Sequence, residues 1–248
     1  MNYITEGFVT AIKLIVSFNR DIYEVVFLSL KVSIIATLLS SAVSIPAGFF
    51  IATNEFKGKK IVITVFNTLM ALPTVVVGLF VYSLISRKGP LGILGLLFTP
   101  KAIIIGEFIL ASPIIIALSI SAINGIDPRV RSTAITLGAN SFQIALTILS
   151  EARFAILAAI IAGYGRVIAE LGSALMLGGN IKCYTRTMAT AIGLETSKGD
   201  FGFALALGFI LLVMEMEKWG QKLFILHRMQ VNSGKFITCF IQIRVMSC

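Results

Sequence analysis

Long apolar runs separated by short polar segments dominate this 248-residue chain. An α-helix needs about 20 mostly apolar residues to cross ~30 Å of hydrocarbon. Four runs reach or pass that length: Val25–Ile51, Ile61–Ile85, Ala102–Ile123 and Phe154–Leu177. The pattern therefore predicts an all-α polytopic membrane protein in which each of these runs is one transmembrane helix.

A fifth apolar run, Phe201–Met214, is shorter. It has 14 residues before Glu215 and Glu217, and at 1.5 Å per residue it would reach only about 21 Å. Three explanations stay open. The helix begins earlier, within Ala189–Thr196; or the two glutamates reach the inner interface with Trp219 as an anchor; or the residues after about Met214 do not follow the pattern of the rest of the chain at all. Counting it, we expect about five transmembrane helices.

The two ends of the chain do not follow this pattern. Residues 3–18 are too short and too mixed to span a membrane, and they predict an interfacial helix. They lack the basic start and small-residue cleavage site of a signal peptide. Residues 231–248 match no structural pattern that we can assign. We therefore expect one transmembrane domain over residues 1–230, followed by a poorly packed tail of unknown structure over residues 231–248.

Composition and charge fit a membrane protein, because 57% of the residues are apolar and only 13% are charged. The net charge of +9 could suit nucleic acid, but the Lys and Arg residues lie between the apolar runs rather than in one patch. Cytoplasmic loops of membrane proteins carry an excess of such residues. We therefore place the basic turn Phe56–Lys60 inside, together with residues 127–152 and the Lys218–Arg228 end, which puts the N-terminus outside. The loops on the opposite side are basic too, so the difference in positive charge between the two sides of the membrane is modest.

A segment between two apolar runs, Asp127–Ala152, predicts a pair of short helices. Asp127 is a typical N-cap residue, and Pro128 suits the first helical position. The first helix should end at Gly138, and a second amphipathic helix should continue into the next apolar run. Such an elbow on the membrane surface could transmit force from a soluble partner into the bilayer. The alternative is an ordinary amphipathic connector.

The fourth apolar run carries two opposite charges, Arg166 and Glu170, which are four residues apart and would share a helix face. A charge at mid-bilayer costs ~2.5–3.5 kcal/mol even on the milder scales, so both should face protein or water. Two interpretations stay open: a self-neutralising pair that braces the helix, or a part for Arg166 in an anion route. Glu107 could pair with Arg166 or lie near the outer interface close to Lys101.

Small residues recur at spacings of three and four along the same run. On a continuous helix they would form a stripe that lets a second helix approach closely: Ala158, Ala162, Gly165, Ala169 and Gly172.

The sequence offers no catalytic chemistry. No Gly-x-x-x-x-Gly-Lys-Ser/Thr loop for ATP occurs, and with His227 as the only histidine no Ser/His/Asp or Cys/His arrangement is credible. The three cysteines, Cys183, Cys239 and Cys248, have no metal-ligand spacing and an odd count. We expect no enzymatic activity, no metal site and no cofactor in this chain.

The elbow resembles the loop of ABC importer permeases that docks on the ATPase subunit. The family's acidic residue and closing Pro are absent here, where the chain reads Ser132, Thr133, Ala134 and then Gly138-Ala139. A second resemblance is more specific and links the chain to the permeases of molybdate, tungstate and sulfate importers. It lies in three stretches, Gly165–Gly172, Met176–Ile181 and Tyr184–Thr187.

Further stretches resemble the tungstate members of that group in particular: Asn67–Pro73, Gly89–Gly92 with Leu96–Pro100, and Leu194–Phe201. The resemblance runs from about residue 5 to about residue 213. It implies an ATP-driven tungstate permease. Molybdate, sulfate or phosphate permeases are alternatives with the same fold. A secondary anion transporter is the alternative from another class, but we find neither the inverted repeats nor the charged relay that it would need.

The resemblance also implies partners and site residues. The partners are a second copy of the chain in the cytoplasmic membrane, ATPase subunits that bind ATP and Mg, and an extracytoplasmic oxyanion-binding protein. Carried over by position, the ATPase contacts would be Ser132, Thr133, Ala134, Gly138, Ala139, Asn140 and Ser141. The translocation path, or the residues that brace it, would be Arg166, Glu170, Gly172, Asn180, Thr185, Arg186 and Thr187.

The last four of these residues have side chains that suit a tetrahedral dianion. Such an ion needs N–H groups, hydroxyls and one or two cations that hold it weakly enough for release. The alternative for the same segment is a Gly-Gly turn followed by a solvated stretch.

Overall fold

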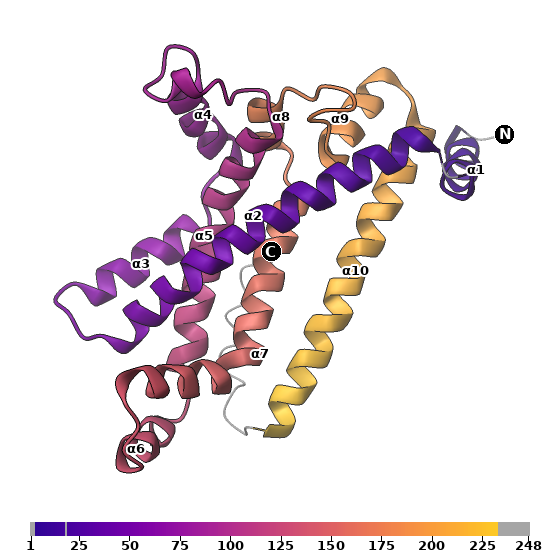
Figure 1. Ribbon diagram of the computed structural model, residues 1–248. Coiled ribbons are helices and arrows are strands. Elements are labelled where there is room, and N and C mark those ends of the chain that lie inside the picture. The colour runs from indigo at the N-terminus through magenta and orange to yellow at the C-terminus, as the bar shows by residue number, and fades with distance from the viewer. Residues whose placement is uncertain (1–2, 18, 233–248) are drawn as a thin grey trace. The chain divides into compact units, whose positions relative to one another are not determined.

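The computed structural model describes the backbone of residues 3–17 and 19–232 and the side chains of residues 7–17 and 19–216. This part of the chain folds into helices joined by turns (Figure 1). The helices are α1 Tyr3–Val16, α2 Arg20–Thr53, α3 Lys59–Leu69, α4 Thr74–Ile85, the short 3-10 helix η1 Gly92–Leu94, α5 Pro100–Asn124, α6 Pro128–Thr136, α7 Ser141–Ile168, α8 Gly172–Gly178, α9 Met188–Lys198 and α10 Phe201–Asn232.

In the part of the chain that the structure describes, three helices, α2, α5 and α7, are long and apolar enough to cross a membrane. The predicted span Ile61–Ile85 is instead divided into α3 and α4, which are bent by 99° at the break between them. Pro73 immediately precedes α4 and has extended backbone angles. Proline has no N–H for the helix ladder and disfavours helical geometry at the residue before it, so the helix is interrupted there.

The fourth predicted span is displaced along the chain. It begins at Ser141, well before Phe154, and α7 ends at Ile168 rather than Leu177. Glu170 therefore lies in the link to α8, and Gly172 is the first residue of α8. The prediction that Arg166 and Glu170 share one helix face is wrong, and so is the prediction of a continuous stripe of small residues from Ala158 to Gly172.

The fifth apolar run belongs to the long helix α10. Its apolar part, Phe201–Met216, continues as helix to Asn232. The earlier start within Ala189–Thr196 is excluded, because those residues belong to the separate helix α9, which Gly199 ends with a left-handed φ of 84°. Most of the predicted tail, residues 233–248 with Cys239 and Cys248, lies outside the described residues.

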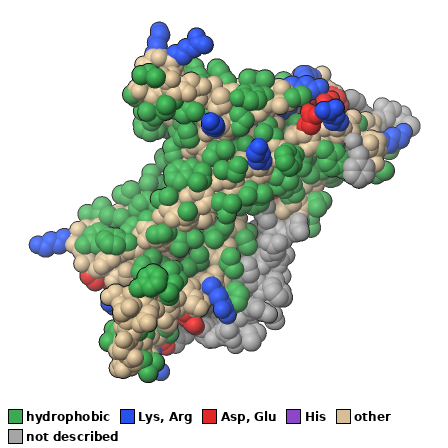
Figure 2. Space-filling model, in the orientation of Figure 1, with side chains coloured by type: hydrophobic (Ala, Val, Ile, Leu, Met, Phe, Trp, Pro, Cys, Tyr) green, Lys and Arg blue, Asp and Glu red, His purple; other side chains and the backbone are tan. Residues whose placement is uncertain are grey.

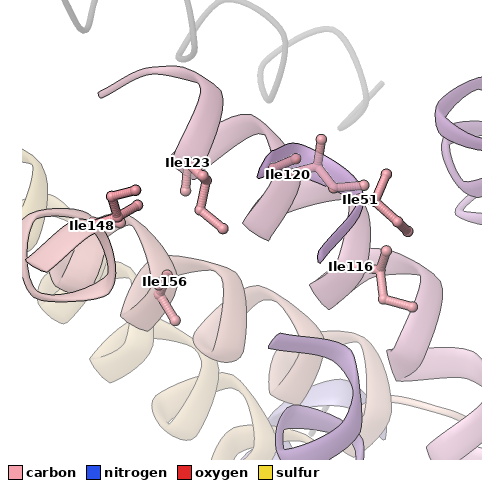
Figure 3. Close-up of a cluster of buried hydrophobic side chains, with 9 residues drawn as sticks. Ile51, Ile116, Ile120, Ile123, Ile148 and Ile156 are labelled. Atoms are coloured by element: carbon pink, nitrogen blue, oxygen red, sulfur yellow. The ribbon is translucent and has the colours of Figure 1, made fainter. Parts of the chain in front are cut away.

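The chain divides into two compact units, and α2, α5, α7 and α10 supply residues to both. The first unit comprises residues 1–40, 71–111 and 164–218, and the second comprises residues 41–70, 112–163 and 219–248. The core of the second unit is a cluster of isoleucines from the end of α2, the second half of α5 and the body of α7 (Figure 3). Its labelled members are Ile51, Ile116, Ile120, Ile123, Ile148 and Ile156.

The first unit has two main apolar clusters. One joins α1, the start of α2, α9 and α10 through Ala11, Ile22, Met188 and Leu207. The predicted N-terminal helix is present as α1, and the ring of Phe8 packs 5.3 Å from that of Phe209 on α10. Its position in a membrane interface stays a prediction.

The second cluster joins α4, α5 and α8 through Val77, Val81, Ala102 and Leu177. Helices α4 and α8 approach closely at Gly78, where an added Cβ would lie 2.9 Å from Cα of Ser173.

Many large apolar side chains lie on the surface of the isolated subunit. They include Phe27, Leu38, Phe50 and Phe80, each more than half exposed. Figure 2 shows one face on which hydrophobic side chains predominate and Lys and Arg side chains are few. Soluble monomers rarely expose apolar surface on this scale. Together with the three long apolar helices, this surface identifies a multi-pass membrane protein.

Candidate functional site

The elbow forms where the sequence predicts it. Oδ1 of Asp127 accepts a hydrogen bond from the backbone N–H of Arg129 at 2.9 Å, and Pro128 is the first residue of α6. Gly138 follows the end of α6 with a left-handed φ of 80°. Glycine adopts this conformation without steric cost. Helix α7 then begins at Ser141 and continues into the apolar run.

The start of α7 is closed by Asn140 and Gln143, whose side chains each accept a hydrogen bond from the other's backbone N–H. This is the reciprocal arrangement of a capping box. Sequence reasoning missed the role of Gln143, although Asn followed three residues later by Gln is a recognisable signal. The direction of the chain is therefore defined on both sides of Gly138.

Most of the predicted ATPase contacts are exposed on this elbow: Ser132, Thr133, Gly138, Asn140 and Ser141. Ala139 is half-buried, and Ala134 is buried within the second unit.

The elbow also exposes large apolar side chains that sequence reasoning did not single out. Leu137 is 81% exposed and Phe142 is 71% exposed, and Ile135 and Leu146 are each at least half exposed. They lie on an elbow that also carries the exposed cations Arg129 and Arg131. Apolar groups among polar ones on a surface are typical of a protein contact site.

Arg166 and Glu170 do not pair. Arg166 is exposed in the last turn of α7, and the ion pairs among the described side chains do not include it. Glu170 is 5% exposed, and its Oε1 accepts a hydrogen bond from the backbone N–H of Ser173 at 3.0 Å. The prediction of a self-neutralising pair is therefore wrong, since the two residues lie in different environments.

Glu107 does not pair with Arg166 among the described side chains, and its position near the outer interface stays a prediction. It is 2% exposed on α5, and its Oε2 has no hydrogen-bond partner. The neighbouring charge is that of Glu170, which repels it when both are ionised.

Gly172 lies beside Glu170 and permits a close approach to α4. A Cβ at this position would lie 2.9 Å from Cγ2 of Val75 and 3.1 Å from Oγ1 of Thr74. Such distances are too short for a real side chain, so Gly172 braces α8 against α4 by its lack of one.

The segment between α8 and α9 is closely hydrogen-bonded. Thr185 is fully buried, and its Oγ1 accepts from the N–H of Ile181 and donates to the carbonyl of Gly178. Thr187 caps α9 through reciprocal bonds with Thr190. The hydroxyls of Thr185 and Thr187 are therefore used within the protein, whereas the stretch Ile181–Tyr184 directly after the Gly-Gly turn is exposed.

Asn180 and Arg186 hold the same segment to α9. Asn180 has a left-handed φ of 51°, and its Nδ2 donates to the carbonyl of Thr190 at 3.2 Å. A guanidinium nitrogen of Arg186 lies 3.7 Å from Oε1 of Glu195, which also pairs with Lys198 at 3.0 Å. The Nε of Arg186 is buried and has no hydrogen-bond partner. The role of Glu195 was not predicted from the sequence.

Comparison with known families decides the class. The family described as "Binding-protein-dependent transport system inner membrane component" matches residues 44–215, which include the elbow, Arg166 and the segment between α8 and α9. The chain belongs to this family. It is therefore a multi-pass permease component of the cytoplasmic membrane. In general terms the family functions with an ATPase and a substrate-binding protein, and its permease components are not themselves catalytic.

Individual relatives agree with this membership. The chain is 39% identical over 214 residues to the tungstate uptake system permease protein TupB of Peptoclostridium acidaminophilum, covering 86% of this chain and 94% of that protein. It is 24% identical over 211 residues to the molybdenum transport system permease protein ModB of Escherichia coli, covering 79% and 92%. A crystal structure of an amino acid ABC transporter has the same fold, with a TM-score of 0.61, 16% identity and coverage of 86% and 96%.

Proposed function

We propose that this chain is the permease subunit of an ATP-driven importer for tungstate. The observation that supports this substrate is the contrast in identity between the two relatives: 39% to the tungstate permease and 24% to the molybdenum permease. Both comparisons extend over more than nine-tenths of the relative. Molybdate is the second candidate, since the binding protein rather than the permease does most of the selecting.

The elbow is the proposed contact with the ATPase subunit. Leu137 and Phe142 present exposed apolar side chains, and the capped helices on both sides of Gly138 make the elbow stiff. A stiff element can transmit a displacement from the ATPase into α7, which is continuous with the second half of the elbow. Two copies of the permease pair in the membrane, and each elbow contacts one ATPase subunit, which binds ATP and Mg.

Arg166 and Arg186 are the proposed cations of the translocation path. Arg166 is exposed on α7 without an ion-pair partner among the described side chains, and a second subunit could enclose it. An unpaired charge at membrane depth is costly, so it should face water or the anion. Arg186 is partly neutralised by Glu195. An anion that is held by so little net positive charge can be released. Thr185 and Thr187 support the path and do not bind the anion.

The test is uptake and ATP hydrolysis by the reconstituted complex of permease, ATPase and binding protein in proteoliposomes. We expect tungstate to stimulate both activities at lower concentration than molybdate. Stimulation by molybdate alone would move the chain to the molybdate importers. Uptake by the permease and binding protein without the ATPase would contradict the importer proposal.

A further inference from the structure

Two buried carboxyl groups of the first unit, those of Glu107 and Glu170, are close enough to repel each other when both are ionised. Glu107 comes from α5 and is 2% exposed; Glu170 comes from the α7–α8 link and is 5% exposed. Their charges interact when both are ionised. A buried pair of like charges is strongly unfavourable, so a positive charge must accompany the pair or one carboxyl must carry a proton.

The protein side chains around the pair do not supply that positive charge. The hydroxyl of Tyr164 on α7 lies in the field of Glu107 and also in that of Glu215 on α10. No Lys or Arg of the described part forms an ion pair with Glu107 or Glu170. Among the described side chains, no partner cation therefore neutralises the pair.

Oxygen atoms without partners lie in the same junction of α4, α5 and α8. Oε2 of Glu107 has no hydrogen-bond partner, and neither has Oγ of Ser173, a residue that is 1% exposed. Ser173 lies between α4 and α5. Its Cβ is 3.8 Å from where a Cβ on Gly106 of α5 would lie, and 3.3 Å from where one on Gly78 of α4 would lie. Buried polar atoms are nearly always satisfied, so two unpartnered oxygens in one junction are available to a further donor or cation.

We propose that Glu107 and Glu170 together bind one positive charge, either a proton or Na⁺. Oε2 of Glu107, Oε1 of Glu170 and the hydroxyls of Ser173 and Thr74 are the oxygen ligands available; Thr74 Oγ1 and Glu170 Oε1 both line the space beside Gly172. Hard cations take oxygen ligands of these types.

The bound charge has a structural consequence for the permease. With it, α5 is held against the α7–α8 link. Without it, the two carboxylates repel, and α5 and the α7–α8 link are driven apart. The site thus makes the stability of the subunit depend on pH or on Na⁺, independently of which anion is transported.

The experiment uses the full-length permease purified in complex with its ATPase. Infrared difference spectroscopy over a pH titration detects a protonated carboxylic acid, and radioactive sodium measures Na⁺ binding directly. Both are recorded for the wild type, Glu107→Gln and Glu170→Gln. Glu55→Gln is the matched control, because Glu55 is an exposed glutamate paired with Lys59.

The two sources of charge give different results. A proton produces a carboxylic acid band in the wild type and in Glu55→Gln that disappears in Glu107→Gln or Glu170→Gln, with no bound sodium. Na⁺ produces about one bound ion per permease subunit that either substitution abolishes, with thermal stabilisation by NaCl over choline chloride lost in parallel. A wild-type complex with neither the band nor bound sodium would overturn the proposal. Because the wild type alone gives that answer, the proposal stays testable even if both variants misfold.

Discussion

Asn140 and Gln143 hydrogen-bond each other in both directions at the start of α7. The backbone N–H of Asn140 donates to Oε1 of Gln143 at 2.9 Å, and the backbone N–H of Gln143 donates to Oδ1 of Asn140 at 2.8 Å. The first backbone N–H groups of a helix have no partner within the helix, and caps of this kind satisfy them. The pair therefore fixes how α7 leaves Gly138, and with it the angle of the elbow.

Replacing Asn140 should weaken the elbow without removing it. Loss of an N-cap side chain costs about 1 kcal/mol, so Asn140→Ala should lower the unfolding temperature slightly and reduce the ATPase activity that the binding protein stimulates. Asn140→Ser is the control, because serine caps a helix nearly as well. Thermal unfolding and ATP hydrolysis of the same purified complex measure both effects. Equal values for Asn140→Ala and the wild type would contradict a role for the cap.

Gly138 should not tolerate a large side chain. Its φ of 80° lies in the left-handed region, where an L-residue costs roughly 1–2 kcal/mol. We expect Gly138→Leu to bend the elbow away from the proposed ATPase contact, so that less ATPase co-purifies with the permease.

Gly199 provides the matched control for this substitution. Its φ is 84°, and like Gly138 it has open space around the position of a Cβ, but it lies between α9 and α10. Gly199→Leu should carry a similar strain and leave co-purification of the ATPase unchanged. Gly138→Asn should retain the contact, because asparagine tolerates the left-handed region. Full ATPase recovery with Gly138→Leu would exclude this part of the elbow from the contact.

The exposed apolar side chains of the elbow should contribute binding energy to the ATPase contact. Leu137→Ser and Phe142→Ser remove large apolar groups that are 81% and 71% exposed in the isolated subunit, so the permease itself should fold normally. At a protein interface such anchors cost 1 kcal/mol or more when truncated, about a fivefold to tenfold loss of affinity. Titration of the ATPase against permease in nanodiscs measures the change. Ile93→Ser, at an even more exposed position on η1, should leave affinity unaltered.

The spans could be predicted from run length, but the bend between α3 and α4 could not. Pro46 and Pro113 lie inside α2 and α5, which continue through them, whereas Pro73 marks the start of α4. A proline in a membrane helix is tolerated where neighbouring groups satisfy the freed carbonyl. Those neighbours come from distant parts of the chain, so the sequence around a proline does not say which outcome occurs.

The site was predicted where it depends on local backbone rules and missed where it depends on tertiary contacts. Asp127, Pro128 and Gly138 act through their own conformational preferences, and the structure confirms the elbow that they predict. Glu170 was misplaced because the argument for a shared face assumed an unbroken helix. Helix α7 ends at Ile168. Gly172 packs against Val75, a residue almost a hundred positions earlier in the sequence.

The segment between α8 and α9 separates a structural role for Thr185 from a transport role for Arg186. Thr185→Val keeps the shape but leaves two partners of Oγ1, the N–H of Ile181 and the carbonyl of Gly178, without a hydrogen bond. Unsatisfied buried groups cost about 1–3 kcal/mol each, so thermal stability should fall, and Thr185→Ser should restore it.

Arg186→Gln should keep most of the stability, since Lys198 still pairs with Glu195, but should slow anion uptake. Uptake by proteoliposomes, normalised to folded complex, measures the difference. Normal uptake by Arg186→Gln would remove this arginine from the proposed path.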